Sequence, residues 1–255
     1  MISGLMILKD GIELGYPFVE AITQVIPYVD EFVVVECGSS DKTMKILIKL
    51  VSKYIDKLRV AIHPWDFSGI NGEKIGEIQT IANKYCKGDH ILLVQADEIW
   101  DKESVEFAVT LPKSYPLVGL FKFPFNHIVG NASIKQTSYD SAVRMYKNDH
   151  RIASEADGWT VAGTMPHLSI DLPTPITHTG SIGWRSSYGK IVHHSKLYKD
   201  NKLYQTNAKE YKKRLDENNP ESFYLSKHPK YESEVPQIIK PLLGIEKYYV
   251  REELL

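Results

Sequence analysis

The chain has 255 residues, of which 43% are hydrophobic and 25% charged, the balance of a globular protein with a full core. The net charge of −1 at pH 7 gives no overall basic field, so we expect no nucleic-acid partner. Two isolated cysteines, Cys37 and Cys86, match neither a disulfide framework nor a zinc site. Lys9 and Asp10 end the first apolar run too early for a signal peptide, and no apolar run reaches the roughly 18 residues of a membrane span. We therefore expect a cytoplasmic protein.

Continuous apolar runs and amphipathic patterns alternate over the first hundred residues. The apolar runs predict strands at residues 2–8, 32–35, 58–62 and 90–94. Apolar residues at helical spacing predict helices at residues 13–28, 41–54 and 73–85. Apolar strands separated by such helices form parallel sheets that are covered on both faces. We therefore predict an α/β fold with a mostly parallel sheet flanked by helices.

The alternation loosens in the second half of the chain. A helix is predicted at residues 102–110, followed by strands at 117–123 and 142–146. Residues 125–179 are rich in Gly, Pro, His, Ser and Thr, which is typical of loops with a small β portion. The helical pattern returns at Gly189. We therefore divide the chain into a domain at residues 1–188 and a helical C-terminal extension at residues 189–255.

The extension is basic and rich in tyrosine. Seven basic and two acidic residues lie between Lys196 and Arg214, and eight of the fifteen tyrosines lie between Tyr188 and Tyr249. Such a helix can contact an anionic membrane, which would make the protein peripherally membrane-associated. It can also pack back on the domain with its lysines in solvent, and we favour this second placement.

Polar side chains follow each early strand, at the sheet edge where open parallel sheets bind ligands. The four segments are Lys9-Asp10, Glu36-Cys37-Gly38-Ser39-Ser40-Asp41, His63-Pro64-Trp65-Asp66 and Gln95-Ala96-Asp97-Glu98. The turn after Glu36 has neither a GxGxxG nor a P-loop pattern, and it is either a ribose-binding turn or a plain helix cap. Asp97 and Glu98 can hold Mg²⁺ or Mn²⁺; alternatively, Asp97 caps the next helix and Glu98 is solvated.

Taken together, these segments resemble the family 2 glycosyltransferases, inverting enzymes with the GT-A fold. VVVECGSSDKT is similar to the strand-and-turn signature of that family, and WDFSGINGEKIGEIQTIANKYCKGDHILLVQADE is similar to the stretch before the DxD motif in its lipopolysaccharide-core-type members. The resemblance covers residues 2–100 well and residues 140–200 loosely. It implies a Rossmann-like sheet with a nucleotide-binding half at residues 1–100 and a looser acceptor half at residues 101–188.

The resemblance also implies roles for individual residues. Lys9, Asp10 and Glu36 would line the nucleoside pocket, and Asp97 would bind the metal that bridges the diphosphate of the donor. The first Asp of the DxD motif is Gln95 in this chain. Its amide can hydrogen-bond a ribose but adds no charge for the metal, so Asp97 needs another ligand or binds the metal more weakly.

Members of this branch take a metal-binding histidine from the later part of the chain. Ile176-Thr177-His178-Thr179-Gly180 resembles the hydrophobic-His-x-Gly element found there, so His178 is the implied second ligand. His193 and His194 are weaker candidates, and His178 can instead be a hydrogen-bonded loop histidine.

An inverting transfer needs a general base to deprotonate the acceptor hydroxyl. In relatives a carboxylate after an Arg-containing strand has this role, and here the strand is followed by Glu155 and Asp157. We choose Asp157 over Glu155, although both can be solvated loop acids. Trp159 and Trp184 can offer apolar faces to a sugar ring or pack in the core.

The sequence thus predicts a metal-dependent glycosyltransferase of the hexosyltransferase type, using Mn²⁺ or Mg²⁺. It would move a sugar, with inversion, from a nucleotide-diphosphate sugar to a glycan, lipid-linked or protein acceptor. Two alternatives are weighed against this prediction. A non-catalytic nucleotide-sugar or carbohydrate binder would explain Gln95, whereas a sugar-phosphate nucleotidyltransferase would need a Gly-rich loop that the segment after Lys9 lacks.

Overall fold

The computed structural model describes residues 1–65, 73–129, 132–133, 141–150, 152–155, 160–163, 168–180, 182–198, 202–226 and 235–255. The strands are β1 (Ile2–Leu8), β2 (Glu31–Glu36), β3 (Leu58–Ile62), β4 (His90–Leu93), β5 (Glu98–Ile99), β6 (Val118–Val129), β7 (Ala132–Ser133), β8 (Ser141–Lys147), β9 (Ile152–Glu155), β10 (Thr160–Gly163), β11 (Leu168–Asp171) and β12 (Ile176–His178). The helices are α1 (Phe18–Val25), α2 (Thr43–Lys53), α3 (Glu73–Ala82), α4 (Lys102–Ser114), α5 (Trp184–Leu197), α6 (Lys202–Asp216) and α7 (Glu221–Leu225), with short 3₁₀ turns η1 (Asn83–Tyr85), η2 (Lys240–Leu242) and η3 (Glu252–Leu254).

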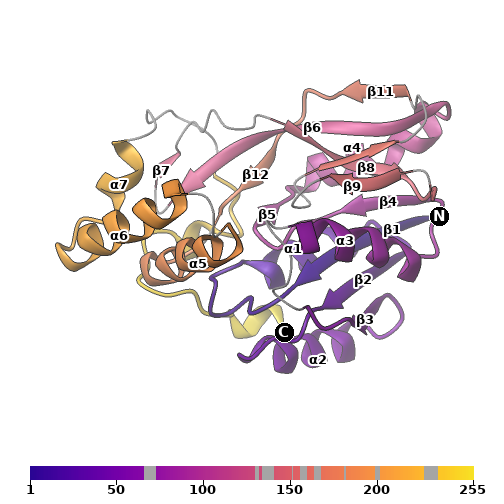
Figure 1. Ribbon diagram of the computed structural model, residues 1–255. Helices are drawn as coiled ribbons and strands as arrows, with labels where there is room; N and C mark the ends of the chain where they lie inside the picture. The colour runs from indigo at the N-terminus through magenta and orange to yellow at the C-terminus, as the bar shows by residue number, and fades with distance from the viewer. Residues whose placement is uncertain are drawn as a thin grey trace.

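One central sheet runs through the molecule in the order β3-β2-β1-β4-β8-β6-β12-β5 (Figure 1). Strands β3, β2, β1 and β4 are parallel, and β8 is antiparallel to both β4 and β6. Strand β6 therefore runs in the same direction as β4, and β12 is parallel to β6. As a result, the carboxyl ends of β1, β2, β4, β6 and β12 point toward the same edge of the sheet.

The sheet separates two hydrophobic cores because side chains alternate between its faces. Met6 and Leu8 of β1 lie in the larger core, which also contains the buried faces of α1, α2 and α4. Leu5 of β1 lies in the smaller core, together with Ile78 of α3. Helices thus cover both faces, as the continuous apolar runs predict.

The first helix is shorter than the sequence pattern predicts. We expected a helix over residues 13–28, but α1 begins at Phe18, immediately after Pro17. Proline has no backbone N–H, so a helix running through Pro17 would lose a hydrogen bond to residue 13. Residues 11–15 form a turn instead, and Gly15 has a φ of 68°, which glycine adopts without steric cost.

The C-terminal segments pack back on the domain. Tyr211 of α6 is buried and donates from its hydroxyl to the Trp184 carbonyl at 3.1 Å. Farther along, Tyr248 is buried in the main core and its hydroxyl lies 2.8 Å from the Glu20 carboxylate of α1. Helix α5 already begins at Trp184, so the predicted division at residue 188 falls inside a helix, and an independent extension stays a prediction. Among the described helices none is long and apolar enough to cross a membrane.

Candidate active site

The register of the strands brings three distant residues together at the carboxyl edge of the sheet. His178 of β12 pairs with His127 of β6 on one side and with Glu98 of β5 on the other. Asp97 precedes Glu98 in the turn that follows β4, and its carbonyl accepts hydrogen bonds from the Thr179 backbone N–H at 2.8 Å and hydroxyl at 3.0 Å. The ends of β4 and β12 are therefore tied to each other.

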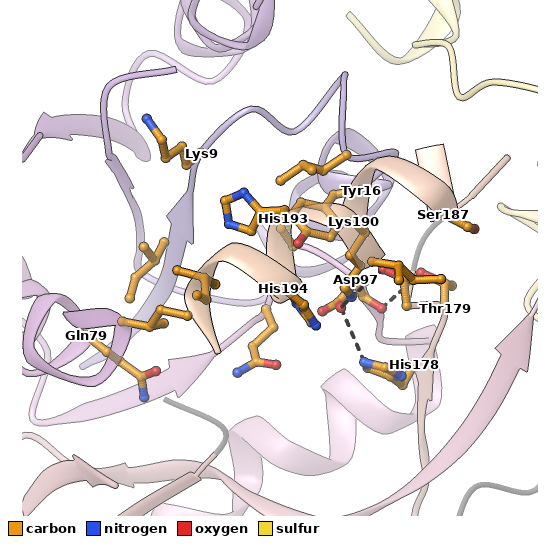
Figure 2. Close-up of a pocket in the computed structure, with 18 of the residues that line it drawn as sticks. Lys9, Tyr16, Gln79, Asp97, His178, Thr179, Ser187, Lys190, His193 and His194 are labelled. Carbon is orange, nitrogen blue, oxygen red and sulfur yellow. Dashed lines mark hydrogen bonds and ion pairs between the residues drawn. The ribbon is translucent and has the colours of Figure 1, made fainter. Parts of the chain in front are cut away.

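A pocket of about 640 Å³ opens at this edge, and side chains of α5 line one of its walls (Figure 2). It lies between the strand ends, α3 and α5. Its polar lining comprises Lys9, Tyr16, Gln79, Gln95, Asp97, His127, His178, Thr179, Ser187, Lys190, His193, His194, Tyr198 and Tyr204. The volume is within the range of roughly 300–1,000 Å³ that small-molecule sites occupy.

Asp97 is the one carboxylate among the described residues that line the pocket. Its Oδ2 atom lies 2.7 Å from the Lys190 ammonium and 3.3 Å from Nε2 of His178 (Figure 2). Burial by itself would raise the pKa of Asp97, but Lys190 and His178 outweigh burial and hold that pKa well below its ordinary value. The carboxylate is therefore ionised at any physiological pH.

Lys190 reaches Asp97 from α5 and has further partners. Its ammonium donates to the Gly180 carbonyl at 2.7 Å and lies 5.0 Å from the centre of the Tyr16 ring. Gly180 has a φ of 63°, a backbone conformation that favours glycine. The hydrophobic-His-x-Gly segment thus contributes two groups to the site, the imidazole of His178 and the carbonyl of Gly180.

A second histidine, His127, contacts the ring nitrogen of His178 that does not face Asp97. Nδ1 of His178 lies 3.1 Å from Nδ1 of His127, which is only 3% exposed. One of these two nitrogens must carry the proton that the other accepts, and either assignment leaves Nε2 of His178 directed at Asp97. The Phe125 ring packs against both imidazoles. This arrangement resembles the outer contacts that orient metal-binding histidines in proteins.

Glu98 has a structural role beside the pocket. Its carboxylate receives the Arg144 guanidinium, with Nε at 2.9 Å from both oxygens and the terminal nitrogen at 2.7 Å from Oε1. Both side chains are fully buried, at 0% and 1% exposure. Because Arg144 neutralises it, Glu98 is not available as the additional metal ligand that the sequence suggested.

The residues expected around the nucleoside divide into two groups. Lys9 and Gln95 line the pocket. Glu36 turns its oxygens to the backbone N–H groups of Gly38 and Ser39, at 3.0 and 2.5 Å, and Asp10 accepts from the Ser40 backbone at 2.6 Å. Asp10 and Glu36 are not among the described residues that line the pocket; their carboxylates hold the turn after β2, and a contact with the nucleoside stays a prediction.

Sequence reasoning missed Lys190, Gln79 and Tyr16. Gln79 lies on α3, is 2% exposed, and its Nε2 atom has no hydrogen-bond partner among the described residues, although the side chain lines the pocket. A polar residue beside Ile78 on the buried face of a helix was the available signal for Gln79. Nothing in the chain near Lys190 distinguished it from the other lysines of the basic extension.

His193 and His194 line the pocket from α5. They are the weaker ligand candidates of the sequence, and both side chains are half-buried. Burial lowers the pKa of His193 to about 4 and that of His194 to about 3, so both imidazoles are neutral at pH 7. His178 is the histidine that contacts Asp97 directly.

Of the two predicted general bases, only the backbone of Glu155 is among the described parts of the chain. Asp157 and Trp159 are outside the described residues. The backbone of Glu155 ends β9 and pairs with Thr160 of β10, and its side chain is outside the described part. Trp184 begins α5 and is half-buried, and it is not among the described residues that line the pocket.

A divalent cation is compatible with the pair formed by Asp97 and His178. Oxygen and imidazole ligands about 2.1 Å from one ion lie roughly 3 Å apart when they occupy neighbouring positions, close to the 3.3 Å between Oδ2 and Nε2. Within the described residues no group of three His, Cys, Asp or Glu side chains could hold a metal. The pair therefore fits an ion such as Mg²⁺ or Mn²⁺ only if substrate phosphates and water complete the coordination.

Comparison with known proteins identifies the fold. No protein-family model and no curated protein matches the chain. The mannosyltransferase PcManGT from Pyrobaculum calidifontis, solved with GDP-Man and Mn²⁺, is 13% identical with a TM-score of 0.51, over 94% of this chain and 67% of that chain. S. aureus TarS 1–349 is 14% identical (TM-score 0.44; 76% and 64% covered), and glucosyl-3-phosphoglycerate synthase from Mycobacterium tuberculosis is 17% identical (TM-score 0.36; 51% and 44% covered).

The likeness to these solved structures concerns the fold alone. The chain spans about two thirds or less of the length of these solved structures. At 13% identity the likeness to the mannosyltransferase shows a common fold, which confirms the predicted GT-A type of α/β architecture.

Proposed function

We propose that this protein is a glycosyltransferase that moves a sugar from a nucleotide-diphosphate sugar to a hydroxyl group of an acceptor. The observation that carries the proposal is the pairing of Asp97 with His178 in a pocket at the carboxyl edge of the sheet. Open α/β sheets bind nucleotides at that edge. The structure of the mannosyltransferase of the same fold was solved with GDP-Man and Mn²⁺, which supports the choice of substrate.

The pocket offers different chemistry at its two sides. Asp97, His178 and Lys190 provide a charged cluster suited to a diphosphate and its counter-ion. Gln79 and Gln95 line the pocket with amides, which can both donate to and accept from a base or ribose. Lys9 adds a cation at the end of β1, where its ammonium donates to the Cys37 carbonyl at 3.2 Å. We propose that the nucleoside lies near Lys9 and that the diphosphate lies near Asp97.

Asp97 and His178 would hold Mn²⁺ or Mg²⁺ together with the phosphates of the donor. Such an ion neutralises the charge that develops on a departing nucleoside diphosphate without needing a proton. The protein supplies the rest: the ion pairs of Asp97 keep its carboxylate ionised, and His127 orients the His178 ring. The adjacent Arg144 fixes the turn by holding Glu98.

The acceptor hydroxyl would attack the anomeric carbon as the bond between that carbon and the diphosphate oxygen breaks. Its proton must pass to a base, and we propose Asp157, with Glu155 as the second candidate. Attack from the face opposite the leaving group gives inversion. The acceptor would be a glycan, a lipid-linked glycan or a protein, and the basic α6 would allow contact with an anionic membrane.

Gln95 favours one second candidate. A non-catalytic nucleotide-sugar binder derived from the same fold would tolerate an amide where charge is otherwise useful for the metal. A panel of UDP- and GDP-sugars, tested by thermal shift with Mn²⁺ and with a chelator, separates the two functions. We expect one donor to raise the unfolding temperature only with Mn²⁺, and ligand at 100 times its Kd adds about 2.7 kcal/mol.

The Asp97→Ala variant provides the specificity test for this panel, and Lys196→Gln on the exposed side of α5 provides the control. The metal-dependent shift should disappear in Asp97→Ala and persist in Lys196→Gln. If a donor raises the unfolding temperature equally with Mn²⁺ and with the chelator, and no nucleoside diphosphate is released, the non-catalytic binder is favoured. If no donor shifts the wild-type protein under either condition, the transferase proposal is wrong.

A further inference from the structure

Lys190 occupies a position that a metal ion would compete for. Its ammonium lies 2.7 Å from Oδ2 of Asp97, the same oxygen that lies 3.3 Å from Nε2 of His178. A divalent cation bound by Asp97 and His178 would stand beside this ammonium, and two cations at such distances repel each other. We propose that Lys190 is an exchangeable counter-ion, which pairs with Asp97 when the site is empty and with the diphosphate of the donor when the metal is bound.

The neighbouring ion pair shows what a permanent pair looks like in this protein. Glu98 and Arg144 are fully buried, and the guanidinium makes several hydrogen bonds in a fixed fork. Lys190 differs in each respect. It is 15% exposed, it lines the pocket, and its ammonium is a compact charge on a flexible stem. The pair of Glu98 and Arg144 is therefore permanent, whereas Lys190 can exchange Asp97 for another anion.

The charges of the site support the exchange. In the empty pocket Lys190 neutralises Asp97, so the pair carries no net charge. A divalent cation and the doubly charged diphosphate of a nucleotide sugar then enter together without leaving charge uncompensated. Asp97 and His178 would then hold the metal, and the displaced Lys190 ammonium would become available to the phosphate oxygens. When the bond to the sugar breaks, the nucleoside diphosphate gains a further negative charge, and a cation already at its oxygens stabilises that charge.

The surroundings of Lys190 allow a short movement of its ammonium. The stem begins on α5, one turn before His194, and its ammonium donates to the Gly180 carbonyl at 2.7 Å and faces the Tyr16 ring. These two contacts do not depend on Asp97. They can hold the ammonium at the pocket wall after Asp97 has bound the metal.

This inference rests on the proposed function, and it makes two predictions of opposite sign for Lys190→Gln. Without its ammonium, Asp97 should bind Mn²⁺ more tightly in the absence of nucleotide, by about tenfold. Once the metal is bound, the same variant should bind UDP or GDP less tightly, by about tenfold, because one cation at the diphosphate is missing. A residue that only supports the fold would not shift the two affinities in opposite directions.

The experiment titrates Mn²⁺ into the full chain, followed by electron paramagnetic resonance, and then titrates UDP and GDP at saturating Mn²⁺ by calorimetry. Lys196→Gln removes the same charge from an exposed position of α5 and should match the wild type in both titrations. Lys190→Arg keeps the charge and should bind Mn²⁺ no more tightly than the wild type. Unfolding temperatures of the metal-free variants report whether each is folded.

Equal or weaker Mn²⁺ binding by Lys190→Gln than by the wild type overturns the exchange. Tighter Mn²⁺ binding together with unchanged nucleotide affinity also overturns it, because the displaced ammonium would then have no second partner. Failure of the proposed function looks different. In that case the Mn²⁺ titration with Lys190→Gln can still show the competition, while neither nucleotide binds any variant.

Discussion

Asp97 and Glu98 are adjacent carboxylates with separate partners: Asp97 lies in the pocket beside Lys190, and Glu98 is buried against Arg144. Both follow the same apolar strand, and in the sequence only the resemblance to the glycosyltransferases favoured Asp97 over Glu98 as the metal ligand. The register of β12 places His178 opposite Glu98 in the sheet, and the Nε2 atom of His178 lies against Asp97. Asp97 is therefore the acid that we propose as a binding residue, and Glu98 holds the turn that presents it.

The ion pair of Glu98 with Arg144 should matter for stability. Replacing Arg144 by Met leaves a fully buried carboxylate without its partner, which costs about 3–5 kcal/mol of the free energy of unfolding. Replacing both residues by apolar ones, in Glu98→Leu with Arg144→Met, should recover much of that loss because no charge then remains buried. Urea denaturation of the single and double variants measures both effects. A single variant as stable as the wild type would show that the pair is not structural.

His127 should influence a metal that it does not touch. In His127→Phe the His178 ring keeps an aromatic neighbour but loses the nitrogen that fixes its orientation. Loss of such an outer contact lowers metal affinity by about 10–100-fold. Mn²⁺ titration measures this, with His150→Phe as the control because the His150 side chain is 91% exposed. Unchanged Mn²⁺ affinity in folded His127→Phe would argue against His178 as a ligand.

Stability should fall on acidification through the histidines of α5. Burial lowers the pKa of His193 to about 4, with Asp10 opposing and Lys196, Lys190 and Lys9 adding to the shift, and burial lowers that of His194 to about 3. Between an ordinary pKa of about 6.5 and these values, the unfolded chain binds protons that the folded chain excludes. Each histidine therefore removes at most about 1.4 kcal/mol of stability per pH unit as the pH falls from about 6.5 toward 4.

The histidine contribution is checked by urea denaturation at several pH values. Replacing His193 and His194 together by Gln should flatten the pH dependence in that window, whereas His150→Gln should leave it unchanged. A slope that persists in the double variant would have to come from other groups, and the neutral burial of the two imidazoles would be contradicted.

Gly15 should be needed to place α5 over the pocket. It has a φ of 68°, and a Cβ atom there would lie 2.4 Å from the Ile182 carbonyl oxygen and 2.4 Å from Cβ of Ser186. Gly15→Ala should lower the free energy of unfolding by about 1–3 kcal/mol and weaken nucleotide binding. Gly189→Ala is the matched control because its nearest neighbour would be at 3.7 Å, and alanine should stabilise this helix by about 0.5–1 kcal/mol. Equal stability of both variants would contradict the close approach.

The sequence predicted the first half of the fold because strand and helix patterns there follow from local periodicity. β1, β3 and the beginning of α3 match the predicted bounds, and the carboxyl edge carries the expected polar residues. The prediction failed for α1, where Pro17 outweighs the apolar spacing. It also could not give the antiparallel insertion of β8 between β4 and β6, since that pairing joins segments far apart in the chain.

The site was predictable only as far as strand ends reveal it. Asp97 and His178 carried signals in their own segments, and the structure brings their side chains together. The sequence around Lys190 carried no such signal, because the role of Lys190 arises from the packing of α5 against the end of β4. The sequence also did not reveal that the oxygens of Glu36 and Asp10, predicted at the nucleoside, accept backbone hydrogen bonds in the turn after β2. Whether a carboxylate accepts hydrogen bonds from the nearby backbone depends on the geometry of the turn, which residue types do not specify.

The most direct test of the account is release of nucleoside diphosphate from the bound donor by the full chain. The donor chosen by thermal shift is incubated with Mn²⁺, and the free nucleoside diphosphate is measured for wild type, Asp97→Asn and Lys196→Gln. We expect Mn²⁺-dependent release by the wild type and by Lys196→Gln, and a loss of at least about 100-fold in Asp97→Asn, the size of effect that removal of transition-state charge stabilisation has in enzymes. Release at equal rates by all three proteins, or binding of the donor without any release, would contradict the assignment of this pocket as the active site of a glycosyltransferase.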